Sequence, residues 1–184
     1  MCRFTAPGSD DFNDMQVVLF QALPQLALRL RSLLMKAYSV GRLQLHSSDP
    51  LVAPDIRLKL LSALEDIRRM RASLRTLGEL IQLEQLVELG TTQIVFDDGE
   101  PMTSSMFIAG LREDDWVDAY AHRVVRHYVH PIGIARMGSI DDELAVVDQH
   151  GRIHGTSNLR LADASIMPTV PSANTNLSCI MIGE

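Results

Sequence analysis

The sequence HPIGIARMG occupies residues 130–138, and it is followed by NLRLADASIMP at residues 158–168 and PSANTN at residues 171–176. In the first run, Pro131 and Gly133 restrict and then redirect the backbone directly after His130. The residue before a proline avoids the helical region, so His130 is expected to be extended. Such a path holds an imidazole in one orientation, as a general base requires.

The last of these runs predicts the start of a helix. Asn174 is a favourable N-cap residue, and residues 175–180 are expected to begin a helix after it. The amino end of a helix presents unpaired N–H groups and a partial positive charge. This end of the chain therefore suits a ring that becomes anionic when it is reduced.

Taken in order, the three runs resemble the carboxyl-terminal signature of the glucose–methanol–choline (GMC) family of flavoenzymes. The resemblance implies two catalytic residues: His130 as the base facing the flavin, and Asn174 as its partner. It also implies that Asp163 approaches the ribityl–pyrophosphate part of FAD. The set of FAD-contacting residues that it implies is Asp163, Ala164, Asn174, Thr175 and Asn176.

The resemblance implies an FAD-dependent oxidoreductase similar to choline dehydrogenase and other alcohol dehydrogenases. Such an enzyme oxidises the CH–OH group of a small alcohol to an aldehyde or ketone by hydride transfer to flavin N5, with His130 as the base. Two departures leave an alternative open. Ile134 stands where the family most often has Thr, and the dinucleotide-binding pattern G-x-G-x-x-G is absent. The alternative is an inactive truncated remnant or a non-catalytic interaction module.

The fold implied by the resemblance is α+β, with a mostly antiparallel or mixed sheet covered on one face by helices. Residues 1–140 are expected to form a substrate-binding domain truncated at its amino end. Residues 141–184 are expected to return to a largely missing FAD-binding domain. That domain is the expected partner, and the chain alone is expected to bind FAD poorly, because the pyrophosphate lacks its helix amino terminus.

The strand predictions come from apolar runs and alternation. Residues 15–20 predict a buried strand, and residues 30–37 and 40–46 predict a strand pair that turns at Tyr38-Ser39. Asp97–Pro101 is expected to be a loop. Short strands and turns are expected from residue 146 to residue 161.

A long helix is predicted after Ser62, which forms a capping box with Glu65. Its apolar stripe recurs every three or four residues and consists of Ile67, Met70, Leu74, Leu77 and Ile81. The other face carries Arg68, Arg69, Arg71 and Arg75. We interpret these arginines as a solvated helix face in preference to an anion site. A further helix is expected from Asp114, with Trp116 in core packing in preference to a substrate pocket.

Composition excludes several classes of protein. Of the 184 residues, 46% are hydrophobic and 22% are charged, as in an ordinary globular protein. Acidic residues outnumber basic ones, 23 to 17, so nucleic acid is not an expected partner. No run approaches the roughly 18 apolar residues of a membrane span. No secretory leader is evident, so a cytoplasmic location is expected.

His127 and His130 lack a further metal ligand, and Cys2 and Cys179 are expected to be free thiols.

Overall fold

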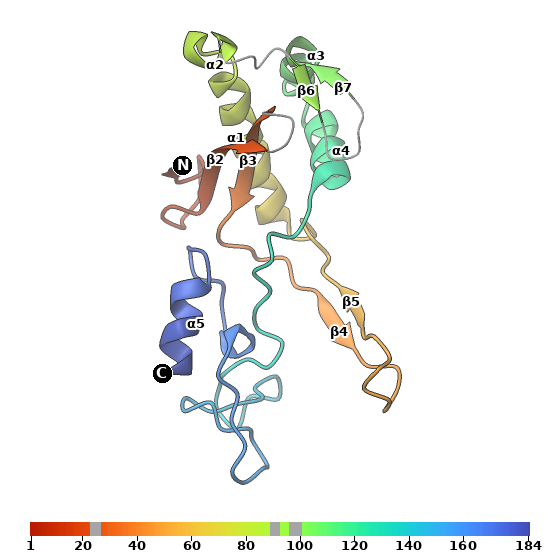
Figure 1. The fold of residues 1–184 in the computed structure, drawn as a ribbon, viewed down its shortest axis with the longest axis vertical. Helices are drawn as coiled ribbons and strands as arrows, with labels where there is room; N and C mark the ends of the chain where they lie inside the picture. The colour runs from red at the N-terminus through yellow and green to blue at the C-terminus, as the bar shows by residue number, and fades with distance from the viewer. Residues whose placement is uncertain (23–26, 89–92, 96–100) are drawn as a thin grey trace. The chain divides into compact units, whose positions relative to one another are not determined.

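A computed structural model of the chain describes residues 1–22, 27–88, 93–95 and 101–184. The chain forms two compact units, each built from two segments (Figure 1). Unit 1 comprises Met1–Ser39 and Leu60–Arg126, and unit 2 comprises Val40–Lys59 and His127–Glu184. The predicted boundary at residue 140 does not coincide with either unit. The assignment of residues 1–140 and 141–184 to two domains of a larger protein stays a prediction.

Unit 1 contains a three-stranded antiparallel sheet in the order β1-β2-β3. Its strands are β1 (Cys2–Phe4), β2 (Met15–Ala22) and β3 (Ala27–Leu34). The strand predicted at residues 15–20 is confirmed. The predicted pairing of residues 30–37 with residues 40–46 is wrong, because β3 pairs with β2.

The failed hairpin has a physical cause at Tyr38 and Ser39. Their backbone N–H groups donate to the carboxylate of Asp66, at 2.7 to 3.1 Å. A tight hairpin needs its turn to bring the two flanking strands together. Here the two N–H groups are held by a helix residue instead, and the chain continues into unit 2.

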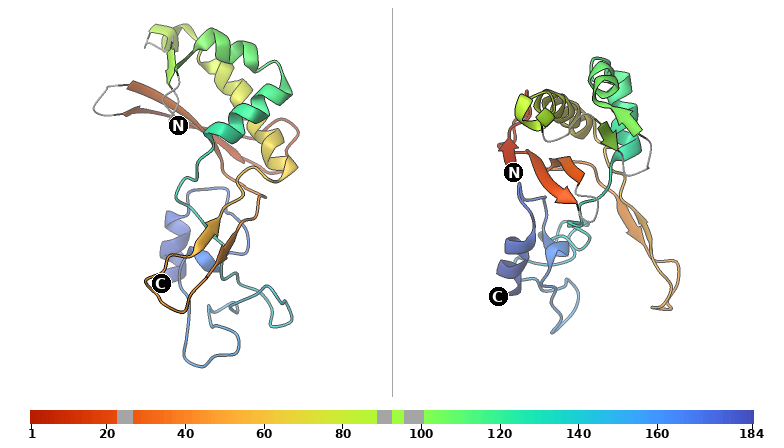
Figure 2. Two further views of the ribbon diagram at one scale, coloured as in Figure 1. Left: turned by 90° about the vertical axis from the view of Figure 1, so that its right-hand side faces the viewer. Right: turned by 45° about the horizontal axis from the view of Figure 1, so that its top comes forward.

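In the described part of unit 1, the remaining elements are four helices and a short two-stranded ribbon. They are α1 (Leu64–Leu80), α2 (Glu84–Glu88), β6 (Gln93–Val95), β7 (Pro101–Thr103), α3 (Ser104–Gly110) and α4 (Asp114–Val124). Helix α1 lies against β2 and β3, and α3 and α4 lie beside α1 (Figure 2). The expected α+β fold, with antiparallel sheets and helices, is confirmed.

Helix α1 confirms the predicted apolar stripe. Ile67, Leu74 and Leu77 are buried in the apolar cluster of unit 1, together with the other two residues of the stripe. The predicted capping box at Ser62 is wrong. The N-cap residue is Ala63, which makes no side-chain hydrogen bond. Burial of the stripe therefore holds the helix in place without a polar cap, as is usual for helices in globular proteins.

The interpretation of the arginine face as solvated is wrong for Arg69. Its side chain is 1% exposed, with Nη2 at 2.6 Å from Asp66 and Nη1 at 3.3 Å from Asp14. Both carboxylates are fully buried. Asp14 also accepts the Ala6 N–H at 2.8 Å. This buried charge network joins the amino-terminal loop to α1, since two carboxylates share one guanidinium.

Two other arginines of α1 pair with α4. Arg71 bonds both oxygens of Asp118, at 2.5 and 2.6 Å, and reaches Asp114 at 2.9 Å. Arg75 also reaches Asp114, at 2.5 Å. The bidentate bond from Arg71 lowers the pKa of Asp118 below its ordinary value. Arg68 fits the prediction of a solvated face, because it is exposed and its ion pair within the described residues is with Glu65 of its own helix.

The aromatic residues of α3 and α4 form one group. The helix predicted from Asp114 is confirmed as α4. Trp116 and Tyr120 stack at 5.2 Å, and Phe107 contacts both rings edge-on. Trp116 packs against the apolar cluster of unit 1, which agrees with the core interpretation.

Unit 2 has little regular structure, and the structure describes all of its residues. Its elements are β4 (Arg42–Gln44), β5 (Asp55–Arg57), a single turn of 3-10 helix η1 (Ala164–Ile166) and α5 (Asn176–Gly183). Strand β4 lies within the predicted strand at residues 40–46, but it pairs with β5. Residues 146–161 make isolated bridges, such as Val147 with Ile153, where short strands were predicted.

One predicted loop lies mostly outside the described residues. Of Asp97–Pro101, the structure describes only Pro101, which begins β7 in place of the expected loop. None of the helices in the described part of the chain combines the length and the apolar character that crossing a membrane requires.

Candidate active site

The HP-x-G segment lies along the segment that contains η1. The N–H groups of Gly133, Ala135 and Met137 donate to the carbonyl oxygens of residues 164, 165 and 166, at 2.8 to 3.3 Å. Three consecutive bonds of this kind hold the two segments in one register. The two motifs that the sequence placed about 30 residues apart are therefore brought side by side by backbone bonding.

The backbone on both sides of His130 is unusual. Gly133 has φ +78°, and a Cβ atom there would lie 3.3 Å from the carbonyl oxygen of Met167. Glycine therefore permits the close approach of the two segments. Val129 has φ +52°, which is a strained conformation for a β-branched residue. Strain of this kind concentrates at functional sites, where the surrounding structure enforces it.

The imidazole of His130 contacts the side chains of two residues, one that follows it in the sequence and one that precedes it. Its Nδ1 lies 2.9 Å from Oγ1 of Thr175, within hydrogen-bonding distance. Its ring also contacts the ring of Tyr128 edge-on, with centroids 5.8 Å apart. Thr175 is buried, whereas His130 is partly exposed. One nitrogen of the imidazole is therefore engaged inside the protein.

The bond to Thr175 also brings the PSANTN segment to His130. Asn174 precedes Thr175 directly, and its side chain is exposed. The prediction that Asn174 caps the helix is wrong: α5 begins at Asn176, and its N-cap residue is Thr175. The hydroxyl of Thr175 makes no capping bond. It contacts the histidine instead, and the helix starts one residue beyond the predicted position.

Asp163 is the N-cap residue of η1. Its Oδ1 accepts hydrogen bonds from Oγ and from the backbone N–H of Ser165, at 2.5 and 2.8 Å. These bonds lower the pKa of Asp163 below its ordinary value, and the bond from the Ser165 side chain has the larger effect. Asp163 is exposed and Ala164 is half-buried. Asp163 therefore presents an ionised carboxylate at the surface of unit 2 at neutral pH.

Sequence reasoning named Thr175 as a cofactor residue but missed its contact with His130. The two residues are 45 positions apart, and no local pattern links them. The buried Arg69 was also missed, although one signal was present. Asp66 and Arg69 are three residues apart, a spacing that places opposite charges together on a helix.

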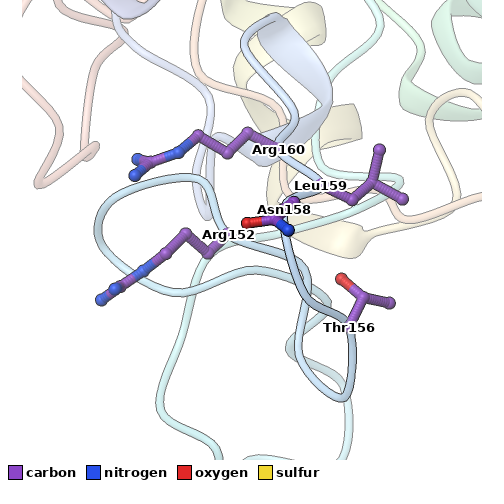
Figure 3. Close-up of a pocket in the computed structure, with 5 residues that line it drawn as sticks. All are labelled: Arg152, Thr156, Asn158, Leu159 and Arg160. Carbon is purple, nitrogen blue, oxygen red and sulfur yellow. The ribbon is translucent and has the colours of Figure 1, made fainter.

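Two cavities of unit 2 are lined by residues other than His130. The first, of about 250 Å³, is shown in Figure 3 and is lined by Arg152, Thr156, Asn158, Leu159 and Arg160. In that view, the side chains of Arg152 and Arg160 extend in the same direction, away from Thr156 and Leu159. Arg152 bonds Asp148 at 2.7 Å, and Arg160 donates to a backbone carbonyl. The second cavity lies around residues 137–140 and His154.

The described residues contain neither a cluster of metal-ligand side chains nor a disulfide. Within them, no three His, Cys, Asp or Glu side chains come close enough to hold a metal ion. Cys2 and Cys179 are both free thiols. Among the predicted site residues, the groups that can carry chemistry are the held imidazole of His130, the exposed amide of Asn174 and the ionised Asp163.

The contact between His130 and Thr175 brings the HP-x-G run and the N-T-N run together within unit 2 of an α+β fold. The family model described as GMC oxidoreductase matches residues 37–183. The chain belongs to the GMC oxidoreductase family.

The chain is also similar to curated relatives in sequence and to a solved structure in fold. The chain is 38% identical to 5-(hydroxymethyl)furfural oxidase of Methylovorus sp. (strain MP688), over 81% of this chain and 28% of the relative. It is 35% identical to oxygen-dependent choline dehydrogenase 1 of Chromohalobacter salexigens, over 82% and 25%. Its fold is similar to pyridoxine 4-oxidase from Mesorbium loti, with a TM-score of 0.70 and 21% identity, over 98% of this chain and 35% of that one. The chain spans about a quarter of the length of the curated relatives.

Proposed function

We propose that this chain is the catalytic, substrate-binding portion of an FAD-dependent oxidoreductase that oxidises the CH–OH group of a small alcohol. The bond between His130 and Thr175 carries the proposal, because it brings the segment of Asn174 to the histidine. The bond uses Nδ1 of the imidazole and does not involve Nε2. Relatives named 5-(hydroxymethyl)furfural oxidase and oxygen-dependent choline dehydrogenase support this substrate class.

In this proposal His130 removes the hydroxyl proton of the alcohol. An alcohol hydroxyl has a pKa of about 16, close to that of water. Free imidazole has a pKa of about 6.5, so forming a full alkoxide would cost about 13 kcal/mol. A base of this strength can act only if proton transfer to it accompanies loss of the hydride from the carbon. The free N–H groups of the Asn174 amide supply a hydrogen bond to the developing oxyanion, and the amide does not titrate.

The residues of unit 2 fit one part of a flavin site. When bound, FAD supplies the acceptor of the hydride, at its N5 position. Asp163 offers an ionised, exposed carboxylate to ligand hydroxyl groups, and Asn174 and Asn176 are exposed on the same unit. The N-cap residue of α5 leaves the first N–H groups of the helix without a side-chain acceptor. Ala164 and Thr175 lie beside these residues in sequence and complete the proposed set.

The rest of the flavin site is proposed to lie on another part of the protein. The chain contains no G-x-G-x-x-G pattern to cradle a pyrophosphate. We expect the purified 184-residue chain to bind FAD poorly, which absorbance of the purified chain in the visible range measures. Flavin present near one equivalent per chain would contradict this expectation. An FAD-binding domain is therefore the proposed partner of this chain.

The experiment that tests the function is substitution of His130 in the complete flavin enzyme that contains this chain. We expect His130→Ala to slow reduction of the flavin by an alcohol by at least about 100-fold, the low end of the range for loss of a general base. Stopped-flow absorbance measures the rate. His122→Ala is the matched control, since His122 is exposed on α4 in unit 1. A rate for His130→Ala within about threefold of the parent enzyme would remove His130 from the role of base.

A second candidate is a non-catalytic interaction module. It is favoured by the exposed apolar side chains of α5: Leu177 is 78% exposed and Met181 is 71% exposed. Exposed apolar surface of this kind marks a contact with another protein surface. The same flavin experiment separates the two candidates, because an interaction module predicts no flavin reduction by any alcohol in the parent enzyme.

A further inference from the structure

The Thr175 hydroxyl lies near two possible hydrogen-bond partners: the first N–H groups of α5 and the imidazole of His130. A threonine at an N-cap position ordinarily accepts a hydrogen bond from an N–H group in the first turn of its helix. Thr175 is the N-cap residue of α5, but its backbone is already helical, with φ −76° and ψ −9°, and its side chain makes no such bond. Its Oγ1 lies instead 2.9 Å from Nδ1 of His130. The hydroxyl therefore bonds to the imidazole and not to the first turn of the helix.

We propose that Thr175 is a positioning residue that holds His130 with a proton on Nδ1, so that Nε2 is the atom that exchanges a proton with substrate. This inference rests on the proposed function, in which His130 is the base. It concerns which nitrogen acts and what fixes that choice. The ring contact with Tyr128 restrains the plane of the imidazole, but a ring contact does not select a tautomer.

The direction of the hydrogen bond follows from the two protonation states of a base. Neutral imidazole has one N–H donor and one acceptor nitrogen, whereas imidazolium has two donors. If the hydroxyl of Thr175 donated to Nδ1, that bond would be lost when His130 gained a proton. If the hydroxyl accepts from the Nδ1–H, the bond is present before proton transfer and becomes charge-assisted after it. The accepting hydroxyl therefore serves both states.

Burial strengthens the argument. Thr175 is 6% exposed, so little water reaches its hydroxyl to replace the bond. A buried polar group without a partner is costly, and the protein avoids this by pairing Thr175 with the imidazole. His130 is only partly buried. The bond to Thr175 occupies Nδ1, so Nε2 is the ring nitrogen left for proton exchange with a ligand.

The first test reads the tautomer directly in the 184-residue chain. Ring ¹⁵N chemical shifts are measured at about pH 8.5, where free imidazole is neutral. The His130 signals are assigned by their loss in His130→Gln. We expect a protonated Nδ1 and an unprotonated Nε2 in the parent chain, and averaged or reversed shifts in Thr175→Val, which removes the hydroxyl but keeps the branched shape. Thr175→Ser should restore the parent pattern.

Thr156→Val is the matched control. Thr156 also lies in unit 2, and its hydroxyl donates to the Ile153 carbonyl at 2.9 Å. This substitution removes a threonine hydroxyl without touching the imidazole, so the His130 shifts should not change. A parent chain with the proton on Nε2, or a Thr175→Val chain with parent shifts, overturns the inference.

The second test uses the complete flavin enzyme. Thr175→Val should lower the rate constant of flavin reduction by about tenfold, by analogy with the lower end of the effect of groups that orient metal-bound histidines. The substrate concentration at half-maximal rate should change little, and Thr175→Ser should recover most of the rate. A merely structural role predicts equal loss in both variants and overturns the inference. Failure of the proposed function looks different, because His130→Ala would then retain the parent rate while Thr175→Val still altered the ring shifts.

Discussion

Unit 1 holds nearly all of the buried apolar side chains, whereas unit 2 holds all of the predicted site residues. Every member of the main apolar cluster belongs to unit 1, including Phe107 and Val117. In unit 2, whose residues are all described, the buried apolar side chains are Val147, Ile166 and Met167. The difference means that the two units are stabilised by different interactions.

Unit 1 gains its stability from apolar area removed from water, to which the buried Arg69 network adds specific pairings. Unit 2 is held by backbone hydrogen bonds between loops, such as those from residues 133–137 to residues 164–166. A segment held mainly in this way opens at a lower free energy than a packed core. The site residues therefore lie on the part of the chain that has the smaller apolar core.

Among substitutions that distinguish the two units, Arg69→Met is expected to have the largest effect on stability. It leaves Asp14 and Asp66 buried without their shared cation, which should lower the free energy of unfolding of unit 1 by about 3–5 kcal/mol. Urea unfolding followed by fluorescence of Trp116, the one tryptophan in the sequence, measures it. Arg68→Met is the control, since Arg68 is exposed and pairs only with Glu65 in α1, and it should cost less than about 1 kcal/mol. Equal effects of the two substitutions would mean that the buried network contributes nothing.

A smaller effect is expected from Val147→Ala in unit 2. Val147 is fully buried, and losing two methyl groups there should cost about 1–2 kcal/mol. Hydrogen exchange at the Gly138 amide, which donates to the Val147 carbonyl at 2.9 Å, should speed up accordingly. The Trp116 unfolding midpoint should not move. Val146→Ala, at a neighbouring exposed position, should change exchange little. A shift of the Trp116 midpoint by Val147→Ala would show that the two units unfold together.

The smallest effect is expected from acid titration of the turn at Asp148. Burial raises the pKa of this carboxylate, but hydrogen bonds from the N–H groups of Arg152 and His150 and from the Arg152 side chain outweigh it and lower the pKa to about 2. Because the folded pKa lies below the unfolded value of about 3.9, the stabilisation is present above about pH 4 and is lost as the pH falls through about 2.

Asp148→Asn tests this pH dependence. At about pH 5 it should reduce protection of the Arg152 amide from exchange by less than about fivefold, because the pair is exposed. The difference from the parent chain should shrink as the pH approaches about 2. Glu143→Gln, an exposed neighbour, is the control. A difference that persists unchanged at about pH 2 would contradict the assigned pKa.

Much of unit 1 could be predicted from local pattern. The stripe from Ile67 to Ile81 identified α1, and the branched run after Met15 identified β2. The pairing of β3 could not be predicted, because Tyr38 and Ser39 look like turn residues until Asp66 captures their N–H groups. The capping box at Ser62 failed for a related reason: packing of the stripe can start a helix without a polar cap.

The sequence alone determined which residue types could carry chemistry: the order of the HP-x-G, L-R-x-x-D and N-T-N runs indicated the family, and the family model agrees. Only the tertiary structure decided which polar groups meet. Arg69 reaches Asp14 across 55 positions, and His130 meets Thr175 across 45. Such pairs leave no periodic pattern, because hydrogen-bond partners are chosen by the folded path of the backbone and not by their spacing along it.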